Sequence, residues 1–148
     1  MRIDIIHHEE DTIRVTIACK HSDAGIDRLK RHIEAWEERI KGKSEGQTVF
    51  VELSRVLYFE TVDNRSFAYT PDQVVEIEQK LYELELLLEQ QETFVRSSKS
   101  QIINMNKIIR LKPELNRTIQ AVMCNGERLY ISRRYAQGIK RRLGIIGG

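Results

Sequence analysis

Residues 94–108, FVRSSKSQIINMNKI, place two cations and three hydroxyl groups within five consecutive positions, between two apolar segments. The polar stretch includes Arg96, Ser98, Lys99 and Ser100. Arginine can bind guanine through two hydrogen bonds, and lysine and serine can bind phosphate oxygens. These residue types therefore predict either a solvated loop or a loop that binds nucleic acid.

Two more polar turns have the same character. The first contains Asn64, Arg65 and Ser66, and the second contains Arg133 and Arg134. Asparagine can pair with adenine as arginine does with guanine. If the three turns gather at one end of a β structure, we expect them to read a major groove of double-stranded DNA without a recognition helix.

The charge of the chain is divided unevenly along its length. The net charge is only +2, but residues 1–90 hold 12 Lys/Arg against 19 Asp/Glu, and residues 91–148 hold 12 against 3. Cations that neutralise phosphates gain affinity by releasing counterions, so the basic part is a candidate surface for nucleic acid. The alternative is that the basic part pairs with the acidic part of the same chain.

Sequence patterns typical of enzymes and metal sites are not found. The chain has no Gly-rich phosphate loop, no GxSxG motif and no Cys or Ser with an obvious His partner. The His7-His8-Glu9-Glu10 stretch contains groups that bind metals, but adjacent side chains in a turn diverge and no second cluster completes a site. We therefore expect no catalytic residue, no metal and no cofactor.

The composition is that of a globular domain, with 41% hydrophobic and 31% charged residues. No apolar run approaches the ~18 residues of a membrane span, and the N-terminus lacks the apolar core of a signal peptide. We therefore expect a cytoplasmic protein.

Residues 1–46 are predicted to form a β-β-α extension. Apolar residues alternate over 3–5 and again over 13–19, as in a half-buried hairpin. A helix is expected from Ser22 to Gly42. Its apolar stripe consists of Ile26, Leu29, Ile33, Trp36 and Ile40. The stripe predicts either a dimer seam or a helix that covers the hairpin.

Residues 47–148 are predicted to form a mainly β domain, after a linker at Gly42–Gly46. The pattern predicts strands at Thr48–Leu53, Val56–Val62, Ser66–Thr70 and Val74–Glu78, a helix over 79–90, and a basic helix over the segment RRYAQGIKRRLG. Asn125-Gly126 predicts a hairpin with a type I′ turn.

Three segments of this domain carry a family resemblance: VLYFETVDNRSFAY, FVRSSKSQIINMNKI and NGERLYISRRYAQGIKRRLG. With their order and spacing, the run from about Thr48 to Gly144 resembles the LytTR DNA-binding domain of bacterial transcription regulators. The resemblance implies an elongated, sandwich-like fold of ten short strands in three antiparallel sheets with little helix. It also implies binding to DNA through loops in successive major grooves.

Carried over by position, the resemblance assigns DNA contacts to Asn64, Arg65 and Ser66, to Ser98, Lys99 and Ser100, and to Arg133 and Arg134. Members often carry His followed by Asn in the middle loop, where this chain has Ser98-Lys99. The difference favours a phosphate contact from Lys99 over base readout. Arg96 joins the candidates from the residue pattern alone.

The resemblance also bears on domain organisation and partners. A receiver domain takes roughly 120 residues, and only 46 precede the β domain, so we expect the stand-alone class of LytTR regulators. Relatives in that class are commonly encoded with a small membrane protein that restrains them. We expect a homodimer on a DNA site of two repeats about one helical turn apart.

Two other functions stay open at this point. A single-stranded nucleic-acid-binding β module needs exposed aromatic residues for base stacking, whereas Phe94 and Tyr130 are expected in the core. A protein-interaction module would use the basic part against an acidic partner.

Overall fold

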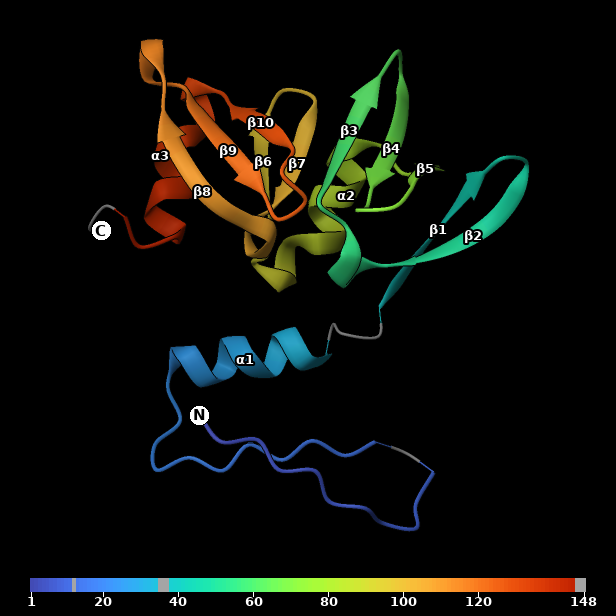
Figure 1. The fold of residues 1–148 in the computed structure, drawn as a ribbon, viewed down its shortest axis with the longest axis vertical. Helices are drawn as coiled ribbons and strands as arrows, with labels where there is room; N and C mark the ends of the chain where they lie inside the picture. Colours follow the sequence, from blue (N-terminus) through green and yellow to red (C-terminus); the bar gives the residue numbers. More distant parts are fainter. Residues whose placement is uncertain (12, 35–37, 146–148) are drawn as a thin grey trace.

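The computed structural model describes residues 1–11, 13–34 and 38–145 (Figure 1). The elements are α1 (Ala24–Glu34), β1 (Arg39–Ser44), β2 (Gln47–Glu52), β3 (Tyr58–Val62), β4 (Arg65–Tyr69), β5 (Val74–Ile77), α2 (Leu81–Leu88), β6 (Phe94–Ser98), β7 (Gln101–Asn104), β8 (Ile108–Pro113), β9 (Ile119–Met123), β10 (Arg128–Ile131) and α3 (Arg133–Arg142). Short 3-10 turns include η2 (Glu89–Gln91) and η4 (Leu115–Arg117). The fold is mainly β, as predicted.

The ten strands form two antiparallel sheets. The larger sheet has the order β2-β1-β5-β4-β3-β7-β6, and the smaller one has the order β10-β9-β8. The implied number of three sheets is wrong, because β1 pairs with β5 through Gly42↔Ile77 and Lys43↔Glu76 and joins the first hairpin to the larger sheet.

Two hydrophobic cores lie on opposite faces of β3 and β7. Phe59 and Ile102 belong to the first core, which α2 covers, and Tyr58 and Ile103 belong to the second, which α3 covers. Successive strand side chains point to opposite faces, so neighbouring residues enter different cores. The central strands are therefore held from both sides, which fixes the turns at their ends.

The structure corrects the prediction for residues 1–46. The helix ends at Glu34 rather than at Gly42, and Arg39–Ser44 is strand β1. No strand is present in the described parts of residues 1–23, and Ile3, Ile5 and Ile13 are 81%, 84% and 83% exposed. An alternating segment forms a hairpin only where its apolar face is covered. Trp36 lies outside the described residues.

Elements of the β domain lie close to their predicted positions, including both helices. The hairpin at Asn125-Gly126 is present, but the type I′ turn is wrong. Only Gly126 has a positive φ, 89°, and its N–H donates to the Met123 carbonyl at 2.8 Å. This geometry is that of a type I turn followed by a left-handed glycine. None of the helices in the described part of the chain is long and apolar enough to cross a membrane.

Gly42 allows β1 to approach β5 closely. A Cβ atom at this position would lie 2.5 Å from the Glu76 carbonyl oxygen and would also overlap the Val75 side chain. Gly42→Ala is therefore expected to lower the free energy of unfolding by about 1–3 kcal/mol, measured by urea denaturation.

The matched control is Gly138→Ala in α3, where an added Cβ meets nothing within 4 Å. Because alanine is the better helix former, this variant is expected to gain about 0.5–1 kcal/mol. Equal stability of Gly42→Ala and the wild type would contradict the close approach.

Candidate nucleic-acid interface

The β3–β4 turn exposes Asn64. Asp63 and Asn64 have φ values of 50° and 63°, which matches a two-residue type I′ turn. Arg65 is held by two hydrogen bonds to Glu76, from Nε at 2.9 Å and from Nη2 at 2.5 Å. This pairing raises the pKa of Arg65 and lowers the pKa of the Glu76 carboxyl. Ser66 is only 3% exposed, and its hydroxyl lies 3.5 Å from that of Thr61.

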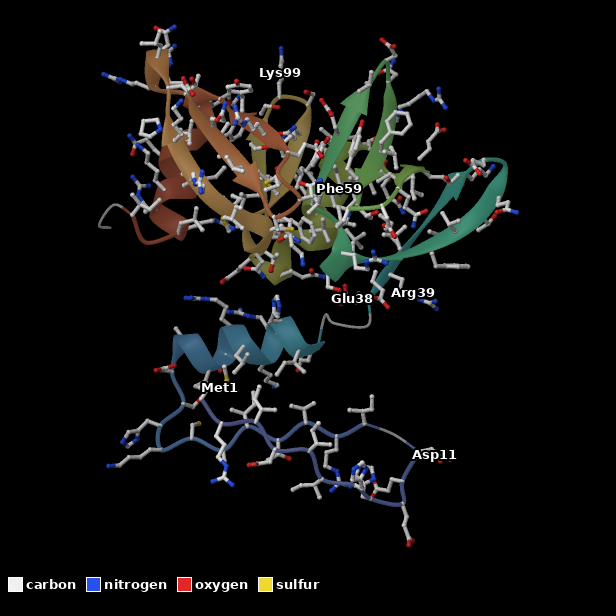
Figure 2. The ribbon with its side chains drawn as sticks, viewed as in Figure 1. Met1, Asp11, Glu38, Arg39, Phe59 and Lys99 are labelled. Carbon is white, nitrogen blue, oxygen red and sulfur yellow. The ribbon has the colours of Figure 1, made fainter. Side chains whose placement is uncertain are left out.

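The β6–β7 loop presents Lys99 and Ser100 at its tip, and Figure 2 shows Lys99 pointing outward at the end of the molecule. Ser98 is half-buried, and its hydroxyl accepts from the Ser100 N–H at 3.3 Å. Below the tip, the fully buried Ser97 hydroxyl donates to Gln101 Oε1 at 2.9 Å. A buried hydrogen bond between Ser97 and Gln101 therefore supports the exposed tip of the loop.

Arg96 does not share this position. It lies within β6, its side chain is 22% exposed, and its Nη1 is 3.3 Å from Glu85 Oε1 on α2. The two groups form an ion pair but not a hydrogen bond. Within the described residues, Nη1 of Arg96 is buried and has no hydrogen-bond partner. The guanidinium therefore packs beside α2 rather than at the loop tip.

The start of α3 presents Arg133 and Arg134, both of which are exposed. The Arg134 guanidinium carbon lies 5.3 Å from the centre of the Tyr135 ring, so the side chain stacks on its neighbour. Within the described residues, neither arginine nor Lys99 forms an ion pair with a carboxylate. Their charges are available to a ligand.

Two main-chain hydrogen bonds tie the three turns together. The Thr61 N–H donates to the Ser100 carbonyl at 2.9 Å, which joins β3 to the middle loop. The Ser132 N–H donates to the Ser97 carbonyl at 2.9 Å, which joins the start of α3 to β6. The β3–β4 and β6–β7 turns rise at the same end of the molecule (Figure 1). Asn64, Lys99 and Ser100 therefore lie at the same end, with Arg65 paired and Ser66 buried behind them. At the start of α3 the two arginines diverge, because Arg133 lines a groove with Lys140 and Arg134 lines one beside α2 with Arg96 and Glu85.

Two neighbouring basic groups were missed from the sequence. The η4 turn lies at the same end in Figure 1, and Arg117 lines a groove of about 290 Å³ with Arg133 and Lys140. Lys41 and Lys43 line a second groove, of about 480 Å³, beside Asn64.

The sequence signals for these basic residues are local patterns. Arg39, Lys41 and Lys43 alternate with buried residues, which is the pattern of a strand with one basic face. That pattern was obscured because the helical stripe was extended through Ile40. For Arg117, the signal was the polar turn around Asn116, where both residues have positive φ angles of 61° and 62°.

Comparisons with known proteins point to one family. Residues 46–144 match the family model described as the LytTr DNA-binding domain. Two relatives from Staphylococcus aureus, strains NCTC 8325 and COL, are each named as an uncharacterized HTH-type transcriptional regulator. Each is 37% identical over 95 residues, which cover 64% of this chain and 63% of the relative. The match thus spans less than two thirds of the length of these relatives.

A solved structure gives the same fold. It is described as the LytTr DNA-binding domain of a methyl-accepting/DNA response regulator from Bacillus cereus. It aligns with a TM-score of 0.68 at 29% identity and covers 73% of this chain and 98% of that chain.

Proposed function

Because the chain belongs to the LytTr DNA-binding domain family, which binds DNA and is not an enzyme family, we propose how it reads a duplex to regulate transcription. The three turns enter successive major grooves of a site built from two repeats, and the protein acts as a homodimer. The observation that carries the proposal is the pair of main-chain bonds, Thr61 to Ser100 and Ser132 to Ser97, which hold the turns together.

The proposed contacts divide by chemistry. Lys99 and Ser100 bind phosphate oxygens, while Asn64 and Arg134 face base edges. Arg133 and Arg117 add phosphate contacts beside them. Lys41 and Lys43 bind the backbone that flanks the β3–β4 turn.

Three of the candidates from the sequence take other roles in this proposal. Ser66 and Arg96 support the interface from behind, since one is buried and the other is paired with Glu85. Arg65 reaches DNA only if it leaves Glu76, so we assign it to orienting the turn.

Recognition through turns agrees with the order of elements. The relatives are named HTH-type, but within the described residues of this chain strands separate α1, α2 and α3. No pair of these helices forms a helix-turn-helix, so the exposed turns are the elements left to enter a groove.

Selection of bound duplexes from a random pool tests the proposal. The expected result is enrichment of two related half-sites at a fixed separation of about one helical turn, roughly 10 bp. A pool that shows no enrichment would contradict sequence-specific reading, and enrichment of a single half-site would contradict the repeated site.

Lys99→Ala is expected to weaken binding to the selected duplex and to a random duplex by the same factor, because a phosphate contact carries no sequence information. It should also reduce the slope of affinity against salt by about one unit. Lys30→Ala is the control, since Lys30 is an exposed cation on α1, where it pairs with Glu34. A loss on the selected duplex alone would assign Lys99 to base readout instead.

Single-stranded binding has weaker support. Phe94 is buried, as expected, whereas Tyr130 is 59% exposed, which corrects its expected place in the core. Its hydroxyl accepts from Gln120 Nε2 at 3.0 Å. One exposed ring on β10 does not make a stacking platform for successive bases.

A small membrane protein that restrains the regulator is the second proposed partner, and the family resemblance alone supports it. Co-purification from membranes with the full chain tests this partner, and recovery of the chain without any membrane protein would contradict it.

A further inference from the structure

The N-terminal arm, residues 1–11 and 13–20, has the pattern of two strands but leaves its apolar side chains exposed. Ile3, Ile5 and Ile13 are each more than 80% exposed, and Val15 is 56% exposed. Figure 1 shows the arm on the far side of α1 from the two sheets. A run of large apolar side chains in water indicates a surface that is covered in the working protein.

The main chain of the arm is also open. In the part of the chain that the structure describes, no hydrogen bond joins a main-chain group of the arm to another main-chain group, although the Glu10 N–H donates to His8 Nδ1 at 3.1 Å. Extended segments with free N–H and C=O groups behave as edge strands and pair with another strand. The occupant that fits is therefore extended polypeptide with apolar side chains at alternate positions.

Helix α1 has two chemically different faces. Arg28 and Arg31 lie 3.7 and 3.6 Å from the Glu92 carboxylate, and His32 Nδ1 lies 3.4 Å from Asn106 Nδ2. These contacts dock α1 on the β domain through polar groups.

The opposite face carries the apolar stripe. Ile26, Leu29 and Ile33 fall on one side of the helix, away from Arg28 and Arg31, because 3.6 residues complete each turn. All three are only half-buried. Leu29 also lines a groove with Glu92 and Asn106 of the β domain, whereas Ile26 and Ile33 lie on the side of the helix opposite Arg28 and Arg31. The arm lies on the far side of α1 from the two sheets (Figure 1).

We propose that the arms of two copies pair with each other as strands and that the resulting sheet packs on the apolar stripes of both α1 helices. This inference rests on the homodimer proposed above and names its surface. An alternating segment is self-complementary across a two-fold axis. The arm region and α1 together span 34 residues, which is close to the roughly 20–30 residues a side of a standard interface.

The charge of the arm favours a second copy over a highly charged partner. Residues 1–20 hold three Lys/Arg and four Asp/Glu. Two of these pairs already meet within the arm, Arg2 with Asp4 at 3.2 Å and Arg14 with Glu10 at 2.7 Å. A nearly neutral segment with both signs has no preference for a polyanion or a basic protein, and it matches its own copy.

Analytical ultracentrifugation of the full chain with Ile5→Asp or Ile13→Asp tests the pairing. Both side chains are exposed in a single copy, so neither change removes a contact within the β domain. The expected result is a wild-type dimer at micromolar concentration and monomeric variants. Leu86→Asp on α2 is the matched control, since Leu86 is also exposed, at 70%, and this variant should stay dimeric.

Two further measurements separate this inference from the proposed DNA binding. The monomeric variants should bind a single half-site as the wild type does, but bind the two-repeat duplex at least about tenfold more weakly, because linked binding is lost. Hydrogen exchange should show protected arm amides in the wild type and none in the variants.

Three outcomes would overturn the inference: a wild-type chain that stays monomeric at about 100 µM, arm variants that stay dimeric, or dissociation by Leu86→Asp alone. The first would leave the arm to a different protein partner. If the wild-type chain did not bind a single half-site, that result would contradict the proposed DNA-binding function rather than the pairing of the arms.

Discussion

Raising the salt concentration from about 50 to about 200 mM is expected to weaken binding to the selected duplex by about three orders of magnitude. The cations proposed to contact DNA are Lys99, Arg133, Arg134 and Arg117, with Lys41 and Lys43 beside the β3–β4 turn. If six of them each neutralise one phosphate, the slope of log affinity against log salt is about −5. Fluorescence anisotropy over a salt series measures it.

The same series separates the other functions. A protein-interaction module would show a small salt response with duplex DNA and no preference for the selected sequence. A single-strand binder would favour the unpaired strand, with a slope of about −0.7 for each phosphate rather than about −0.9. Replacing Lys41 and Lys43 together by alanine should reduce the duplex slope by about two units, because both side chains are exposed on one face of β1.

The charge asymmetry along the chain predicts a nucleic-acid surface in residues 91–148, and this stays a prediction. The alternative was that the basic part pairs with the acidic part. Among the described ion pairs, Arg96 with Glu85 is the one in which a cation of residues 91–148 meets a carboxylate of residues 1–90. Lys99, Arg133 and Arg134 form no ion pair with a described carboxylate, although Arg134 lines a groove with Glu85 of α2.

The anchors of the middle loop could be predicted because short-range patterns determine them. Phe94, Ile102 and Ile103 are 8%, 1% and 0% exposed, as expected from two apolar strands around a polar tip. The state of the polar side chains could not be predicted in the same way. Arg65 pairs with Glu76 because β4 and β5 align Ser66 with Ile77, and that register depends on the whole sheet.

The N-terminal prediction was wrong where two periodicities overlap. Ile33 and Ile40 are seven residues apart and fit a helical stripe, but Ile40 is buried in β1 together with Gly42 at a period of two. Gly42, which the sequence pattern predicts as the end of a helix, instead allows β1 to approach β5 closely. Local sequence alone does not decide between a helix and a strand here, because the residues that pair with Gly42 and Lys43 are Ile77 and Glu76 of β5, far along the chain.

The proposed recognition of DNA depends on turns held by the β sheets rather than on a long helix. The β3–β4 and β6–β7 turns adjoin β3 and β7, which both cores hold, and the start of α3 follows β10, which packs in the second core. The bonds from Thr61 and Ser132 fix the spacing between the turns. Side chains held in this way lose little conformational entropy on binding. A substitution at the exposed tip should therefore alter DNA binding without altering the free energy of unfolding.

Arg134→Ala is expected to lower the affinity for the selected duplex by about 10–150-fold, equivalent to 1–3 kcal/mol, and to relax the preference at one base pair. Arg134 is exposed at the first turn of α3, and its guanidinium carbon lies 5.3 Å from the centre of the Tyr135 ring. A pre-oriented guanidinium can form two hydrogen bonds to guanine at low entropic cost. Quantitative binding to every single-base variant of the selected site measures the change.

Arg141→Ala is the matched control, because Arg141 is an exposed cation in the last turn of the same helix. Both variants remove one positive charge, but only Arg134 lies close in sequence to Ser132, whose N–H bonds to Ser97 of β6. If Arg134 reads a base, only Arg134→Ala loses the preference for the selected duplex over a random duplex. Equal losses in both variants, on selected and random duplexes alike, would reduce Arg134 to a general electrostatic contact and leave Asn64 as the remaining base-reading side chain.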